Sequence, residues 1–188
     1  MKAAVVALGL LFLSGCVSSN YVYVPNTIPY GVQQNLRTVG SGEVAFEFQG
    51  HQNAETVVAT LEKVKSVQYQ MNTPMRSMFR ELIESKFPSL NPEAEDKIYI
   101  EVKEFVTYDG GDQHQISMTL RVVAEVDQKM HDREFSYRLR VPMQRVPVGM
   151  APGVTLPPDA IHDYLLKYVV ATDRFIDGIF GVDQTGGR

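Results

Sequence analysis

Cysteine is nearly absent from this 188-residue chain and occurs once, at Cys16. A single cysteine excludes a disulfide within the chain, so stability must come from packing. Histidine is also sparse. None of the four histidines has a second histidine or a cysteine at a metal-ligand spacing, and no His-Glu-x-x-His motif occurs. The sequence therefore predicts no metal site and no cofactor.

Basic residues are not in excess either. The net charge is −4, whereas general nucleic-acid binding needs a basic face, so we expect no nucleic-acid partner. Gly-x-Ser-x-Gly and phosphate-loop patterns are missing, which makes an enzyme the minority reading. Beyond the N-terminal segment no apolar run approaches the length of a membrane span, about 20 residues.

What is present begins at the N-terminus. Lys2 precedes an apolar run over residues 3–13, and small residues lead to Cys16. This order is typical of an export signal, here residues 1–15, and the Leu-Ser-Gly-Cys sequence resembles a bacterial lipobox. That resemblance implies that Cys16 becomes the first mature residue and carries acyl chains, including palmitate, which hold the protein on a membrane. The alternative is an ordinary secretory signal with a chance cysteine.

The compartment follows from the next residue. Val17, not aspartate, follows Cys16, and in enterobacteria-like sorting this indicates the outer membrane. We expect a lipid-anchored protein on the periplasmic face of that membrane. Residues 16–42 are predicted to be the acylated N-terminus and a flexible tether, with Tyr21 and Tyr23 in plain tether, in an edge strand or at the lipid interface. Residues 43–182 are predicted to form one periplasmic domain, and residues 183–188 a frayed end.

The hydrophobic periodicity of the domain predicts an α+β fold, with two amphipathic helices packed on one face of an antiparallel sheet of about four to five strands. Strands are expected at residues 43–48, 66–71, 97–105, 116–126 and 135–141. Helices are expected at residues 74–87 and 159–180, the first capped by Thr73 with Pro74 at its first position.

The connections are less regular. Residues 54–61 are a short helix or a loose crossover, residues 109–112 a tight turn, residues 127–132 a hairpin loop, and the proline-rich residues 143–158 irregular. His114 and His131 are expected in exposed turns. Phe105 is expected on the polar side of its strand.

Arg121, Arg138 and Arg140 fall on the polar face of neighbouring predicted strands. Such a cluster suits a phosphate, a carboxylate or an acidic partner, so these three residues are the candidate anion or partner contact. Glutamates share that face, and an ordinary solvated surface with cross-strand pairs is the alternative. No catalytic residues are predicted.

The strand at residues 97–105 with its Tyr-Asp-Gly turn, the lipobox, and the helix containing Arg-Glu-Leu-Ile-Glu (residues 80–84) together resemble the YajG-type lipoprotein family of proteobacterial envelopes. The order of elements is also similar to auxiliary lipoproteins of lipid-transport ABC systems. The resemblance covers residues 43–180 and implies no catalytic residues. The proline-rich residues 143–158 depart from it.

We expect a non-enzymatic accessory or scaffold subunit of a cell-envelope assembly, with an envelope protein as its partner. A lipid- or glycan-binding module that uses a groove between helices and sheet is the alternative. A cell-wall hydrolase or esterase is a third possibility, and it would need a pocket that gathers two ionisable groups.

Overall fold

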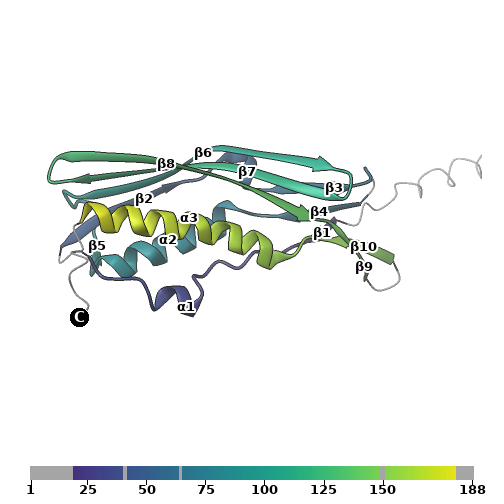
Figure 1. Cartoon of the computed structure of the whole chain (residues 1–188), viewed down its shortest axis with the longest axis horizontal. Coiled ribbons are helices and arrows are strands. Elements are labelled where there is room, and N and C mark those ends of the chain that lie inside the picture. Colours follow the sequence, from purple (N-terminus) through teal and green to yellow (C-terminus); the bar gives the residue numbers. More distant parts are fainter. Residues whose placement is uncertain (1–18, 40–41, 64, 149–150, 181–188) are drawn as a thin grey trace, which may run out of the picture.

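The computed structural model describes residues 19–39, 42–63, 65–148 and 151–180. The predicted signal, Cys16 and the frayed C-terminus lie outside these residues. The α+β class and a five-stranded sheet are confirmed, but the structure also has a third helix and two further sheets. Figure 1 shows the long strands as one layer and helices α2 (Asn72–Lys86) and α3 (Pro158–Ile179) as the second.

The main sheet has the strand order β5-β2-β6-β7-β8. Its members are β5 (Ser89–Leu90), β2 (Glu43–Gln49), β6 (Lys97–Gly110), β7 (Gln113–Val126) and β8 (Lys129–Pro142). The last three form the expected antiparallel meander, whereas β2 runs parallel to both neighbours, so the sheet is mixed. Alternate residues of β7, the strongest strand signal in the sequence, are buried throughout.

Helices α2 and α3 bury one stripe each, as the periodicity predicts. The buried residues of α3 are Ile161, Tyr164, Leu165, Tyr168, Val169, Thr172 and Ile176. Tyr168 ties this helix to the sheet, because its hydroxyl accepts from the backbone N–H of Tyr137 at 3.0 Å and donates to the carbonyl of Met118 at 2.5 Å. The hydroxyl of Tyr164 donates to the carbonyl of Tyr137 at 2.8 Å. Both buried hydroxyls are therefore satisfied by the backbone of β7 and β8.

The start of α2 differs from the prediction. The helix begins at Asn72, two residues before Pro74, and no side chain caps it. The Asn72 side chain instead bonds the backbone of His51, whose N–H donates at 3.2 Å and whose carbonyl accepts at 2.9 Å. Thr73 is exposed and hydrogen-bonds Gln70. A tertiary contact with the turn after β2 thus replaces the local cap.

A three-stranded sheet completes the second layer beyond the helices. It consists of β1 (Ser19–Tyr21), β4 (Lys65–Tyr69) and β3 (Val57–Leu61), in that order, and the 3₁₀ turn η1 (Gln52–Ala54) precedes β3. The prediction of a helix or crossover at residues 54–61 is therefore wrong. Threonine and valine favour strands, and residues 57–61 form a strand because they pair with β4.

Two predicted loops are largely strand. Asp127 and Gln128, with φ of 51° and 61°, form a two-residue turn, so the hairpin loop at residues 127–132 is shorter than expected. Residues 143–158 contain the hairpin of β9 (Gln144–Val148) and β10 (Ala151–Thr155) rather than irregular chain. Pro147 lies opposite Pro152 in this hairpin. Each strand of a two-stranded hairpin keeps a free edge, where the missing N–H of proline is tolerated.

The N-terminal segment is not a flexible tether in its described part. Strand β1 pairs with β4, Ile28 is buried, and the short helix α1 (Tyr30–Gln33) follows. The Ile28 N–H donates to Glu81 of α2 at 2.8 Å, and the Val39 N–H donates to the Lys86 carbonyl at 3.0 Å. The described part of the chain is therefore folded from its first residue, Ser19. The prediction missed this because the partners lie far away in the sequence.

Candidate functional site

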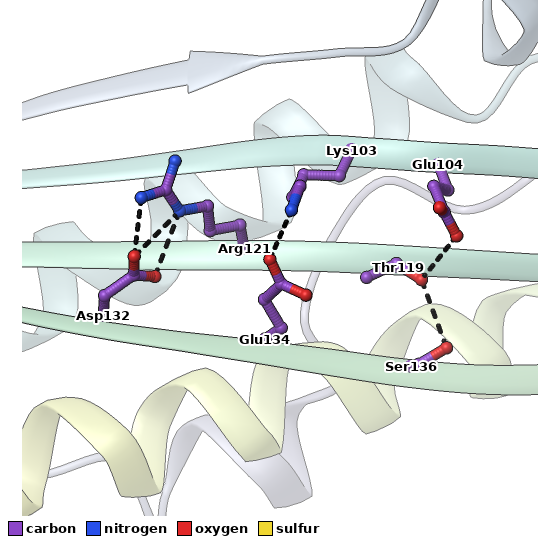
Figure 2. Close-up of polar contacts among 7 residues, drawn as sticks. All are labelled: Lys103, Glu104, Thr119, Arg121, Asp132, Glu134 and Ser136. Atoms are coloured by element: carbon purple, nitrogen blue, oxygen red, sulfur yellow. Dashed lines mark hydrogen bonds and ion pairs between the residues drawn. The ribbon is translucent and has the colours of Figure 1, made fainter.

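The candidate site is the outer face of the meander, defined as the side chains of β6, β7 and β8 that point away from the helices. Figure 2 shows its central part, with β6 uppermost and β8 lowest. The labelled residues are Lys103, Glu104, Thr119, Arg121, Asp132, Glu134 and Ser136. The described helices pack on the opposite face of the sheet, so this face remains open.

Two ion pairs run across the strands of this face. Arg121 of β7 binds both oxygens of Asp132 of β8, with nitrogen–oxygen distances of 2.6, 3.0 and 3.1 Å. The ammonium of Lys103 lies 2.5 Å from a carboxylate oxygen of Glu134. The hydrogen bond from Arg121 holds the pKa of Asp132 below its usual value, and the hydrogen bond to Glu134 raises the pKa of Lys103. Part of the arginine cluster is thus neutralised, as cross-strand pairing predicts.

A β-bulge puts Lys103 in this position. The register between β6 and β7 shifts between Val102 and Glu104, so Lys103 is an extra residue in β6. An extra residue reverses which side chains face inward, because side chains alternate with a period of two. Phe105 is therefore buried, and its predicted place on the polar side is wrong.

Arg138 and Arg140, the other two predicted contact residues, also lie exposed on the outer face of β8. Among the described side chains neither has a partner carboxylate within ion-pair distance, in contrast to Arg121. Their rows continue across β7 to Val106 and Tyr108 of β6, which are 62% and 64% exposed. This end of the outer face combines unpaired positive charge with exposed apolar surface. Arg145, which follows β8, pairs with Glu62 instead.

A buried polar cluster, which the sequence did not reveal, links the meander to the three-stranded sheet. His114, predicted in an exposed turn, is fully buried at the start of β7. Its Nδ1 lies 2.5 Å from Asp109 Oδ1 and its Nε2 lies 2.6 Å from the Tyr69 hydroxyl. The other oxygen of Asp109 accepts from the Thr60 N–H at 2.7 Å. The only advance signal was the even spacing of His114 with the buried stripe of β7.

Chemistry assigns one proton in this cluster. A carboxylate only accepts, so Nδ1 of His114 donates to Asp109, while Nε2 shares a hydrogen bond with the Tyr69 hydroxyl. Burial, and secondarily the charge of Asp109, raise the pKa of Tyr69 far above its ordinary value. The hydroxyl therefore stays protonated at alkaline pH values where an exposed tyrosine ionises. All three polar groups satisfy one another, which favours a structural role.

Replacement of Tyr69 by phenylalanine tests that role. The change leaves Nε2 of His114 buried without its hydrogen-bond partner, which should lower the free energy of unfolding by about 1–3 kcal/mol. Urea unfolding of the full chain measures the loss. Tyr108→Phe is the matched control. Tyr108 lies in the β6–β7 hairpin that carries Asp109 and His114, but it is exposed, so the change should alter stability by less than about 0.5 kcal/mol. Equal midpoints for the two variants would refute a stabilising cluster.

An open cleft lies beside the end of β2. It has a volume of about 730 Å³ between the end of β2, the η1 turn and the start of α2. Its lining includes Glu47, Gln49, His51, Glu55 and Arg76. Its wall is mixed, with more polar than apolar surface.

Within the described ranges, no group of three His, Cys, Asp or Glu side chains gathers in a way that could hold a metal ion. No helix in the described part of the chain combines the length and the apolar character needed to cross a membrane.

Comparison with models of known protein families finds no match, and comparison with curated proteins finds none either. Solved structures with a partly similar arrangement include the hypothetical protein CT253 from Chlamydia trachomatis. It is 15% identical, covers 77% of this chain and 100% of its own, and has a TM-score of 0.42. A crystal structure described as an uncharacterized protein is 10% identical, covers 84% of this chain and 96% of its own, and has a TM-score of 0.39. Likenesses of this degree indicate neither a family nor a function.

Proposed function

We propose that this chain is a lipoprotein of the bacterial outer membrane, anchored through acylated Cys16 and facing the periplasm. It serves there as a non-enzymatic accessory or scaffold subunit of an envelope assembly, of the kind that the resemblance to YajG-type lipoproteins suggests. The observation that carries the proposal is the small-residue sequence that places Cys16 directly after the apolar signal.

The packing of the N-terminal segment adds a geometric expectation. Three residue steps separate Cys16 from Ser19, the first residue of β1, and they span at most roughly 10 Å. An acylated Cys16 would therefore hold the body against the bilayer rather than on a long tether. The buried cluster of Tyr69, His114 and Asp109 satisfies itself, and the outer face of the meander is the surface left open for a partner.

The open face supports a binding role by its composition. Arg138 and Arg140 lack carboxylate partners among the described residues, and Val106 and Tyr108 are exposed beside them. Unpaired arginine and exposed aromatic side chains are enriched where proteins meet. A carboxylate-bearing protein surface fits this combination, and it agrees with an accessory or scaffold role.

Cys16→Ser tests the anchor. The full chain is expressed in a bacterium with labelled palmitate, and membranes are separated from soluble proteins. The wild-type chain should carry the label and sediment with outer membranes, whereas Cys16→Ser should lose the label and appear in the soluble fraction, because two or more acyl chains supply the attachment. A Cys16→Ser chain that stays unlabelled yet sediments like the wild type would overturn the proposed anchor. Ser18→Ala is the control variant and should leave the labelling with palmitate unchanged.

The scaffold role has its own outcome in the same cells. Crosslinking of intact envelopes, followed by purification of the wild-type chain, should return the same protein partners in repeated experiments. Repeated recovery of the chain with no crosslinked protein of any kind would contradict the role, even if Cys16 is acylated.

A further inference from the structure

Strand β8 presents a long open edge. It is the last strand of the main sheet, it has 14 residues, and no described strand pairs with its outer side. The two-residue turn makes Val126 and Lys129 a hydrogen-bonded pair, and such pairs then recur at every second position. The alternate residues direct their backbone N–H and C=O groups away from β7. These residues are Met130, Asp132, Glu134, Ser136, Arg138 and Arg140.

The hydroxyl of Tyr168 supports this assignment. It lies between the Tyr137 N–H and the Met118 carbonyl, so these two backbone groups face each other across β7 and β8. Tyr137 thus belongs to the set that points toward β7, and its neighbours Ser136 and Arg138 to the set that points outward. A row of unpaired backbone groups is a template for another strand.

The charges along this edge have a symmetric order. Asp132 and Glu134 are negative, Ser136 is neutral, and Arg138 and Arg140 are positive. All five side chains share the outer face, because they occupy alternate positions. An antiparallel copy of the same strand, turned about a two-fold axis through Ser136, places each carboxylate opposite an arginine. Asp132 meets Arg140 of the second copy, and Glu134 meets Arg138 of the second copy.

We propose that two copies of this chain associate through β8, which pairs antiparallel with itself about Ser136 and joins two five-stranded sheets into one of ten strands. The proposal deepens the accessory role proposed above and rests on it for its biological setting, but the pairing itself does not need the acyl anchor. Each copy offers the same surface patch, as a two-fold interface requires.

The register is specified by charge. In the proposed register, each carboxylate lies between the cation of its own sheet, Arg121 or Lys103, and an arginine of the second copy. Shifting the strands by two residues moves Arg140 opposite the uncharged Met130 and Glu134 opposite the uncharged Ser136, so two of the four charge pairs are lost. Arg138 and Arg140 have no carboxylate partner in the described single chain, and among these registers only the proposed one gives a partner to both of them at once.

The opposite face of the same edge is apolar. Phe135 and Tyr137 are half-buried there, and the register brings Phe135 opposite Tyr137 of the second copy. An open groove of about 420 Å³ runs between Tyr137 and α3, with Leu166, Val170 and Ala171 in its wall. Helix α3 contacts β8, and β8 is the last strand of the sheet in the described part of the chain. Pairing of two β8 edges would cover part of this apolar surface and add cross-strand aromatic contacts.

Charge reversal tests the proposal with the full chain in detergent. The variants are Asp132→Arg with Glu134→Arg, and Arg138→Glu with Arg140→Glu. Either variant paired with itself sets four like charges against four, which should weaken dimerisation about 100-fold or more. An equimolar mixture sets four positive against four negative charges, so the mixture should dimerise as the wild type does. Sedimentation analysis measures the mass of each sample.

The mixture also controls for folding, because two misfolded chains would not restore a dimer. A wild-type chain that stays monomeric at tens of micromolar would overturn the proposal, as would a reversed variant that dimerises alone like the wild type. Recovery of the wild-type monomer with a strand of another envelope protein on β8 would also overturn it.

A second measurement fixes the axis. Ser136→Cys places two thiols at a Cα separation of about 5.5 Å across the proposed pair, so a short bis-maleimide should link two chains. Thr119→Cys, the hydrogen-bonded neighbour of Ser136 on β7, is the matched control and should link far less. Both changes are made in the wild-type and the Cys16→Ser chain. Linking in the Cys16→Ser chain without membrane attachment separates failure of the anchor from failure of the dimer.

Discussion

Alkaline solution should unfold this protein steeply above pH 10, because three of its nine tyrosines are fully buried with intact hydroxyl networks. Burial is the largest cause that raises the pKa of Tyr69, Tyr164 and Tyr168 above the ordinary value, which is about 10. Ionisation of any of these three hydroxyls in the folded state would leave a buried negative charge without compensation. The folded chain therefore keeps these protons where the unfolded chain releases them.

The sign of the effect follows from that difference. Below about pH 10 both states hold the protons, and the stability is fully present. Above it the unfolded chain binds fewer protons than the folded chain, so the free energy of unfolding falls by about 1.4 kcal/mol per pH unit for each buried tyrosine. Three such groups give about 4 kcal/mol per pH unit. A domain with about 5 kcal/mol of stability would then unfold near pH 11.

Urea unfolding at a series of pH values measures the slope, and the absorbance of tyrosinate shows whether three tyrosines ionise only with unfolding. Tyr164→Phe should reduce the slope by about one third, to roughly 3 kcal/mol per pH unit, since one titrating group is removed. Tyr30→Phe is the matched control, because Tyr30 is 73% exposed and should leave the slope unchanged. A wild-type slope no steeper above pH 10 than below it would contradict the prediction.

Replacement of Lys86 by methionine should destabilise the protein by roughly 3 kcal/mol. Lys86 is fully buried at the end of α2, and its ammonium forms ion pairs with Asp173 and Asp177 of α3. The two carboxylates are four residues apart on one helix, so they repel each other once the ammonium is gone. Removal of one partner from a buried ion pair leaves charge without compensation.

The size of the effect is bounded by exposure and tested by matched variants. The side chains of Asp173 and Asp177 are 18% and 30% exposed, which places the expected loss at the lower end of the range for buried pairs, about 3–5 kcal/mol. Arg80→Met removes an exposed ion pair with Glu84 on the same helix and should cost less than about 1 kcal/mol. Lys86→Met combined with Asp173→Asn and Asp177→Asn should recover most of the loss. A Lys86→Met chain as stable as Arg80→Met would contradict the prediction.

The pattern of the sequence predicted those elements whose signal is local. Alternation over β7 and the stripe of α3 each extend over more than ten residues, and the structure buries the side chains that the pattern selects. The candidate residues Arg121, Arg138 and Arg140 do share one face, because the period of a strand determines its sidedness. Which of them is paired depended on Asp132, a residue that the sequence placed in a loop.

Features that depend on distant partners were missed. The bulge at Lys103 places Phe105 in the core. His114, near the turn between β6 and β7, is buried beside Tyr69. Residues 57–61 form a strand because they pair with β4. The N-terminal segment looked like a linker because Val22, Val24 and Ile28 are spaced among prolines. Their burial comes from contacts with a sheet and a helix that lie some 40 to 60 residues later in the chain.

The sequence by itself predicted the export signal and the acylated cysteine, and it determined the α+β class and the polar sides of β7 and β8, because each depends on neighbours within a few turns or pleats. Only the tertiary structure decided which polar groups are buried, which arginine keeps its charge free, and which strand ends the sheet. Those depend on strand order and register, which bring together residues far apart in the chain, and no local period encodes them.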